Sequence, residues 1–324
     1  MKINKQKAAG TRRAEIFCIC VLAYMLVHWV VFYVGQNVNS ILLAFQKFDP
    51  ETEQQVFLKG SHLFDNFKKF FQDLFQDPSI GRYFLTGALY HLITLIALPL
   101  SWMVSFLIYK KLPLAGFFKI IMFLPSILSS MVIAMIFKYA SLDGFRGVWM
   151  NILELPYNEF PSLLYNEKYA LATMIAYQFF FAVNGSLLIN IGTMSRTPVD
   201  LVEYGKLEGL TLFQEFYTVT LPLMFPMLQV MCLGIFVGFF NAVGPLYALY
   251  GDGHAAGVYM PENVKTFGYY MLTSVISSNV NELGDPRHMY GYTTAANLSI
   301  GLVSIPIVWG TKKLLDRFDP EAEF

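Results

Sequence analysis

The sequence predicts an all-α polytopic membrane protein with six transmembrane helices. Three observations lead to this prediction: 55% of the residues are hydrophobic, only 14% are charged, and six apolar segments are long enough to cross a bilayer. The mean hydropathy is +0.47. A soluble domain carries about 25% charged residues, and a crossing helix needs about 20 mostly apolar ones. The bilayer is therefore the expected solvent for most of the chain.

The predicted transmembrane domain covers residues 16–315, between an N-terminal tail (1–15) and a C-terminal tail (316–324). Within it, the six predicted spans lie at about 16–35, 84–108, 115–137, 169–193, 221–249 and 292–311. The first span follows a basic segment, as the core of a signal peptide does. Its apolar run is too long for that role and no A-x-A-like cleavage site follows Gly35, so a retained helix is favoured.

The distribution of positive charges predicts the orientation. Lys and Arg are denser in the short segments at the termini, between the second and third spans and between the fourth and fifth than in the long loops 36–83, 138–168 and 250–291. Because the positive-inside bias is counted over short loops near span ends, both termini and the loop 196–220 are expected in the cytoplasm. The expected location is the cell (plasma or inner) membrane.

Several functions are excluded by what the sequence lacks. The formal net charge is zero, which gives no basic surface for nucleic acid. Cys18, Cys20 and Cys232 lie in apolar runs, without the spacing of a disulfide framework or a metal site. No G-x-x-x-x-G-K-[ST], H-E-x-x-H or G-x-S-x-G motif occurs. The sequence predicts no catalytic residue, cofactor or metal in this chain, so any ATP chemistry must come from a partner.

The loop 36–83 contains one helical pattern of apolar residues. Its members are Phe64, Phe67, Phe71, Leu74 and Phe75, and Asp77-Pro78 ends the pattern. This spacing is typical of an amphipathic helix at the outer membrane interface. A surface for docking a partner is the alternative.

The loop 196–220 is predicted to form two capped helices joined by a glycine. Thr197-Pro198-Val199-Asp200 places a capping threonine, a proline at the first helical position and an acidic residue that completes a capping box. Gly209 supplies the left-handed residue that ends the helix. Thr211–Gln214 repeats the capping-box pattern and begins a second helix, which runs to Leu221-Pro222. Such an element is stiff and can transmit a push on its tip to the fifth span.

This loop resembles the E-A-A loop of ABC importer permeases, in which E-A-A-x-x-x-G is followed, after about nine residues, by I-x-L-P. Glu203 stands at the glutamate position and Gly209 at the glycine position, whereas two other residues replace the alanines. The expected ATPase-coupling residues are Glu203, Tyr204, Gly205, Glu208, Gly209, Leu221 and Pro222. The likeness to carbohydrate importers of the maltose-transporter type, which depend on binding proteins, extends from about residue 40 to the C-terminus.

The resemblance implies an ABC importer permease (MetI-like) fold with a cytoplasmic coupling helix. It implies a permease subunit of an ATP-driven importer for a sugar or oligosaccharide. The expected partners are a second permease, two ATPase subunits that hold ATP and Mg, and an extracytoplasmic solute-binding protein. Three alternatives remain: an importer of a non-sugar solute, an uncoupled channel and an intramembrane enzyme. For the loop itself, the alternative is a connector helix without a partner.

Candidate substrate contacts lie in the fourth and fifth spans, where neutral amides stand beside aromatic rings. Amides bond hydroxyl groups and rings stack on the C–H face of a sugar. Apart from Lys119, no Asp, Glu, Lys or Arg lies in the middle of a span, which disfavours an ion-coupled carrier and favours a neutral cargo. The candidates are Gln178, Asn184, Phe239, Asn241, Tyr177 and Phe181. The alternative role for the amides is hydrogen bonding between helices.

Overall fold

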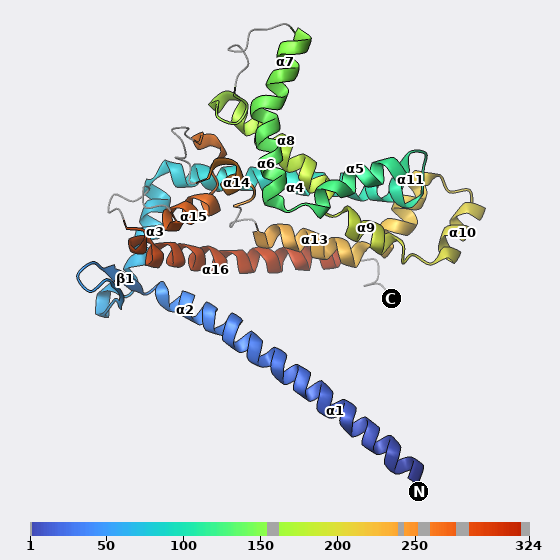
Figure 1. The fold of residues 1–324 in the computed structure, drawn as a ribbon, viewed down its shortest axis with the longest axis horizontal. Coiled ribbons are helices and arrows are strands. Elements are labelled where there is room, and N and C mark those ends of the chain that lie inside the picture. Colours follow the sequence, from blue (N-terminus) through green and yellow to red (C-terminus); the bar gives the residue numbers. More distant parts are fainter. Residues whose placement is uncertain (1, 154–161, 239–242, 252–259, 277–284, 319–324) are drawn as a thin grey trace. The chain divides into compact units, whose positions relative to one another are not determined.

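The structure is a computed structural model that describes residues 2–153, 162–238, 243–251, 260–276 and 285–318. The described part is mainly helical (Figure 1), as predicted. The chain divides into two units: Met1–Phe71 with Arg287–Ser299, and Gln72–Pro286 with Ile300–Phe324.

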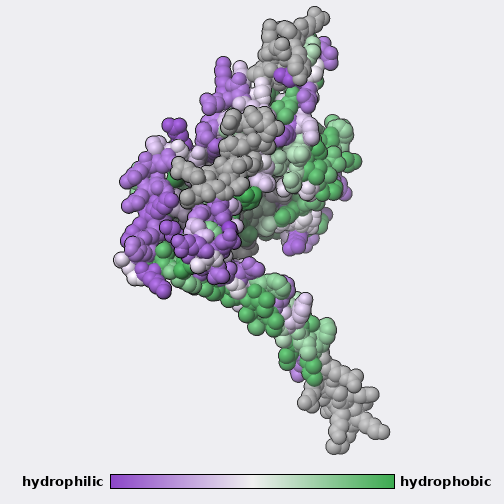
Figure 2. Space-filling model, turned by 60° about the vertical axis from the view of Figure 1, so that its left-hand side comes forward, coloured by the Kyte–Doolittle hydropathy of each residue, from purple (hydrophilic) through white to green (hydrophobic). Residues whose placement is uncertain are grey.

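The first unit begins with a long helical segment. It consists of α1 (Lys2–Trp29), a π-helical turn (Val30–Val34) and α2 (Gly35–Leu43) (Figure 1). Glu15–Leu43 has the length and hydropathy of a membrane crossing. Nearly all apolar side chains of Glu15–Leu43 are exposed, and the surface of this stretch is largely hydrophobic (Figure 2). A helix pairs its own backbone N–H and C=O groups, and one with an apolar surface can be solvated by lipid.

A β-hairpin that the sequence did not predict follows this helix. β1 (Gln46–Asp49) pairs antiparallel with β2 (Gln54–Phe57), with Gln46 opposite Phe57. A short 3-10 turn (Gly60–His62) leads to α3 (Asp65–Gln76), which confirms the amphipathic helix expected in this loop. The helix buries Phe70, which was not in the predicted apolar set, whereas Phe75 of that set is 84% exposed.

Hydrogen bonds hold the first unit together around one glycine. Asn66 Nδ2 donates to the carbonyl oxygens of Ala44 and Gln46, at 2.8 Å each. Gly291 lies at the start of α16 (Tyr290–Leu315), and a Cβ atom there would lie 2.3 Å from Gln46 O and 2.7 Å from Asn66 Nδ2. Only glycine fits at this position without displacing its neighbours. A 3-10 turn (Pro286–Met289) precedes α16 and places the Arg287 guanidinium 4.3 Å from the ring centre of Phe48.

The second unit is organised around α4 (Pro78–Tyr109), which contains the predicted span 84–108. Asp77 begins this helix, because its side chain accepts a hydrogen bond from the Ser79 N–H at 2.8 Å. α4 packs along α8 (Glu167–Gly185) and α9 (Leu187–Met194), which together correspond to the predicted span 169–193.

Two of the predicted spans are bent rather than straight. Within 115–137, α5 (Ala115–Ile127) ends and α6 (Ser130–Tyr139) begins. Leu128 is extended at the break, and the Ser129 side chain caps the new helix. The helical segment that begins at Ser130 runs to Ile152 at 106° to α5. A π-helical turn (Ala140–Gly144) and α7 (Phe145–Leu153) continue from α6.

Within 221–249, Leu212–Leu223 meets α13 (Phe225–Gly238) at 74°. α14 (Leu246–Tyr250), a 3-10 turn (Glu262–Val264) and α15 (Phe267–Ile276) follow in the described part, and α16 leads to a last 3-10 turn (Asp316–Phe318). Four described helices are long and apolar enough to cross a membrane, or up to six if each bent pair counts as one span. The prediction of six spans corresponds to the upper count.

Candidate functional site

The predicted helix–glycine–helix element is present in the loop 196–220. α10 (Val199–Leu207) is followed by Gly209, whose φ of +76° lies in the left-handed region, and then by α11 (Leu212–Glu215). The capping box predicted at Thr211 is confirmed: its N–H donates to Gln214 Oε1 at 2.8 Å, and its hydroxyl accepts from the Gln214 N–H at 3.4 Å. A π-helical turn (Phe216–Thr220) and α12 (Leu221–Leu223) continue the second helix.

The start of α10 differs from the prediction. Pro198 occupies the N-cap position instead of the first helical position, and no side chain accepts a hydrogen bond there, so the capping box predicted from Thr197 and Asp200 does not form. Thr197, the expected cap, precedes that position and is buried. Because the helix begins at Val199, the Thr197 hydroxyl is one residue too early to meet the free N–H groups of the first turn.

α10 presents an exposed surface of apolar and acidic side chains, which we call the α10 tip. Leu207 is 85% exposed and Tyr204 is 69% exposed, and Glu203 and Glu208 are also exposed. Gly205, by contrast, is buried, and a Cβ atom at this position would lie 3.0 Å from Leu210 Cδ1. The helix is thus held on one side by the following loop, while the side chains of the α10 tip stay exposed among the described residues.

The second helix of the element packs on the end of α4. Phe216 and Phe106 are buried with ring centres 5.0 Å apart. The apolar cluster at this contact, which we call the base cluster, consists of Phe106, Met194, Phe216, Met224 and Leu228, and the partly buried Leu221 packs against it. α10 therefore projects from a firmly packed base.

Three of the predicted substrate contacts lie together on the wall of one cavity. Tyr177, Phe181 and Asn184 line a cavity of about 280 Å³ between α8 and the break of α5 and α6. The ring centres of Tyr177 and Phe181 are 4.4 Å apart. Asn184 Nδ2 donates to the Phe180 carbonyl at 2.7 Å, and its buried Oδ1 has no hydrogen-bond partner among the described residues.

Gln178 lines a different cavity, of about 310 Å³. Its Nε2 donates to Thr94 Oγ1 of α4 at 3.0 Å, so the amide hydrogen bonds between helices as the sequence alternative proposed. His91 and Tyr90 line the same cavity, and His91 Nδ1 lies 2.8 Å from the Gly87 carbonyl. The other two candidates, Phe239 and Asn241, lie outside the described residues.

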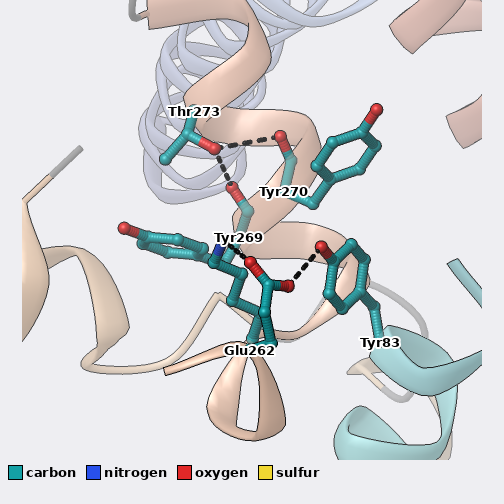
Figure 3. Close-up of polar contacts among 6 residues, drawn as sticks. Tyr83, Glu262, Tyr269, Tyr270 and Thr273 are labelled. Carbon is teal, nitrogen blue, oxygen red and sulfur yellow. Dashed lines mark hydrogen bonds and ion pairs between the residues drawn. The ribbon is translucent and has the colours of Figure 1, made fainter. Parts of the chain in front are cut away.

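A polar cluster at the start of α4 was not predicted from the sequence. The Tyr83 hydroxyl donates to Glu262 Oε2 at 2.7 Å, and the two groups point toward each other (Figure 3). Burial alone raises the pKa of the Glu262 carboxyl, but hydrogen bonds from Lys265 and Tyr83 outweigh it and hold that pKa below its ordinary value. Asn263 Nδ2 donates to the Glu167 carbonyl at 2.7 Å, so the turn also binds the start of α8. The pairing depends on residues far apart in sequence, and no local pattern signals it.

Comparisons with known proteins agree with this architecture. No family model and no curated protein matches the chain. Solved structures are similar to it, among them two crystal structures. One is a bacterial ABC transporter involved in the import of the acidic polysaccharide alginate, with 17% identity, a TM-score of 0.69 and coverage of 94% of this chain and 96% of that chain.

The other is a bacterial alginate ABC transporter in complex with an alginate pentasaccharide-bound periplasmic protein, with 16% identity and the same TM-score and coverage. The chain therefore has the fold of ABC importer chains.

Proposed function

We propose that this chain is the transmembrane permease subunit of an ATP-driven ABC importer for a sugar or oligosaccharide. It forms half of the translocation path and docks an ATPase through the Glu203–Pro222 loop. The single observation that supports this most is the α10 tip: an exposed apolar and acidic surface on a short helix whose base is packed into the membrane domain. An exposed apolar surface with a polar rim is typical of a protein–protein contact.

The proposed partners are the ones that the sequence resemblance implies. The sequence of this chain contains no P-loop, so ATP and Mg bind in partner ATPase subunits. A second permease completes the path, and an extracytoplasmic solute-binding protein delivers the cargo to the outer loops. The chain lies in the cell membrane with both termini in the cytoplasm, as the distribution of Lys and Arg predicts.

The cargo is a neutral carbohydrate. The cavity lined by Tyr177, Phe181 and Asn184 offers two aromatic rings and a side-chain amide, which suit the C–H face and the hydroxyl groups of a sugar. No Asp, Glu, Lys or Arg lines this cavity or the one beside Gln178 in the described part. A carboxylated cargo would require a cationic side chain in the cavity that binds it. The acidic polysaccharide of the structural neighbours is therefore not the cargo that we propose.

The test is affinity purification of the tagged chain from its native membrane, followed by mass spectrometry and a transport assay. We expect a P-loop ATPase and a second permease to copurify. Replacing Glu203 by Trp or Gly209 by Val should remove the ATPase and abolish ATP-driven uptake.

Two controls match these variants. Glu51→Trp places the same side chain at an exposed position of the hairpin turn, and Gly60→Val strains a second glycine with positive φ, +60°, in open space. Both controls should keep the ATPase, which is the property that the Glu203 and Gly209 variants are expected to lose. Retention of the ATPase and of uptake by Glu203→Trp and Gly209→Val would contradict the proposal.

A further inference from the structure

Lys110 and Glu215 form an ion pair between the membrane domain and the loop element. Lys110 is the residue that ends α4, and Glu215 is the last residue of α11. Their side chains are only 14% and 8% exposed, and the ammonium group contacts the carboxylate. The other ion pairs among the described residues each include a side chain that is more than 40% exposed. This pair is therefore the one that is withdrawn from solvent on both sides.

Aromatic rings lie beside the pair. The Lys110 ammonium lies 5.6 Å from the ring centre of Phe106 and 5.8 Å from that of Tyr109. Phe106 in turn packs on Phe216, the residue after Glu215. Separating two buried charges leaves each without compensation, which is strongly unfavourable. The contact between α4 and α11 therefore resists opening.

Buried hydrogen bonds join α4 to the helices beside it. Asn190 of α9 donates through Nδ2 to Ser101 Oγ and Ser105 Oγ of α4, at 3.3 Å each. Ser101 also donates to the Val183 carbonyl of α8 at 2.7 Å. These three polar side chains are completely buried, so the hydrogen bonds hold α4, α8 and α9 in one register. A displacement of α4 must carry the other two helices with it.

We propose that Lys110 and Glu215 are positioning residues that transmit movement of the α10 tip to α4, and through the buried serines and Asn190 to α8 and α9. This rests on the proposed function, because it needs an ATPase that moves the tip. The sequence resemblance points to the tip and to the fifth span, which follows it directly. The ion pair adds a second route by which the movement is transmitted, to α4. Lys110 at the end of α4 lies about one hundred residues before Glu215 in the chain, and α8, which packs on α4, lines both cavities.

The test uses the assembled transporter in proteoliposomes and measures uptake, ATP hydrolysis and their ratio. We expect Lys110→Met and Glu215→Gln to lower uptake per ATP hydrolysed by about tenfold or more, because each leaves a buried charge or dipole unpaired. The exchanged variant Lys110→Glu/Glu215→Lys should restore the ratio. Lys111→Met is the matched control, because Lys111 is adjacent and exposed, and it should behave as the wild type.

A second measurement covers the case in which a single variant does not assemble. Cysteines replace Lys110 and Glu215 in a chain whose three native cysteines are substituted, and a short bifunctional reagent then joins them. Because the contact between Lys110 of α4 and Glu215 of α11 is proposed to stay closed throughout the transport cycle, the cross-linked transporter should keep its uptake per ATP hydrolysed. Loss of uptake on cross-linking would overturn the inference, as would a wild-type ratio in Lys110→Met. Failure of the wild-type chain to bind any ATPase would instead overturn the proposed function itself.

Discussion

Gly291→Ala should destabilise the first unit, although alanine is usually the better residue in a helix. The added Cβ would lie 2.3 Å from Gln46 O, 2.7 Å from Asn66 Nδ2 and 3.3 Å from Leu43 O. None of these atoms is at the end of a mobile side chain. Gln46 is paired in the hairpin with Phe57, and Asn66 is held by two hydrogen bonds of 2.8 Å.

The expected magnitude follows from three contributions. Overpacking a filled site costs about 1–3 kcal/mol. Loss of one Asn66 hydrogen bond costs about 0.5–1.5 kcal/mol more. Alanine recovers about 0.5–1 kcal/mol relative to glycine in a helix. The net destabilisation is therefore about 0.5–4 kcal/mol.

Thermal unfolding in detergent, followed by intrinsic fluorescence, measures this change. In globular proteins of about 150–250 residues each kcal/mol corresponds to about 2–4 °C in Tm, and a lowered Tm is the expected readout here. Gly301→Ala is the matched control, since Gly301 lies in the same helix with no atom within 4 Å of the added Cβ; its Tm should stay the same or rise slightly. A Gly291→Ala protein as stable as Gly301→Ala would refute the reasoning.

Three further variants probe single contacts. Asn190→Ala should destabilise the second unit by about 1–3 kcal/mol, because it leaves the buried hydroxyls of Ser101 and Ser105 without its amide; an unchanged Tm would show that the network does not hold the helices. Thr211→Ala should cost about 1 kcal/mol through loss of the capping box, and limited proteolysis in the loop 196–220 should accelerate; equal cleavage rates would contradict this. The pKa of Glu262 lies below its ordinary value of 4.5, so its contribution to stability is present above that pH and is lost as the pH falls through the lowered pKa. Between neutral pH and pH 3.5 the Tm of the wild type should fall more steeply than that of Glu262→Gln, and parallel profiles would contradict the assignment.

The sequence predicted the elements whose evidence is local. The apolar lengths predicted helices at the six expected positions, helical spacing predicted α3, and Gly209 with the Thr211 capping box predicted the elbow. The hairpin 46–57 was missed because its strands are short and rich in polar residues, so they show no clear alternation. The break at Leu128 was missed because apolar residues continue on both sides of it.

The candidate site was predictable only in part, for a related reason. A motif identified the α10 tip, since the loop lies in one continuous segment. The partner of Gln178 depends on which face of α8 meets α4, and periodicity alone does not fix this in a helix that is apolar on all sides. Lys110 was seen only as a positive charge near a span end, because its partner Glu215 belongs to another element.

The most direct test of the central claim is photo-cross-linking from the α10 tip in native membranes. A photoreactive amino acid replaces Leu207, which is 85% exposed, or Phe75 of α3, which is 84% exposed and serves as the control. The account predicts that illumination joins position 207 to a protein with a P-loop, and that position 75 gives no such product. Absence of the ATPase adduct from position 207, or the same adduct from position 75, would contradict the account.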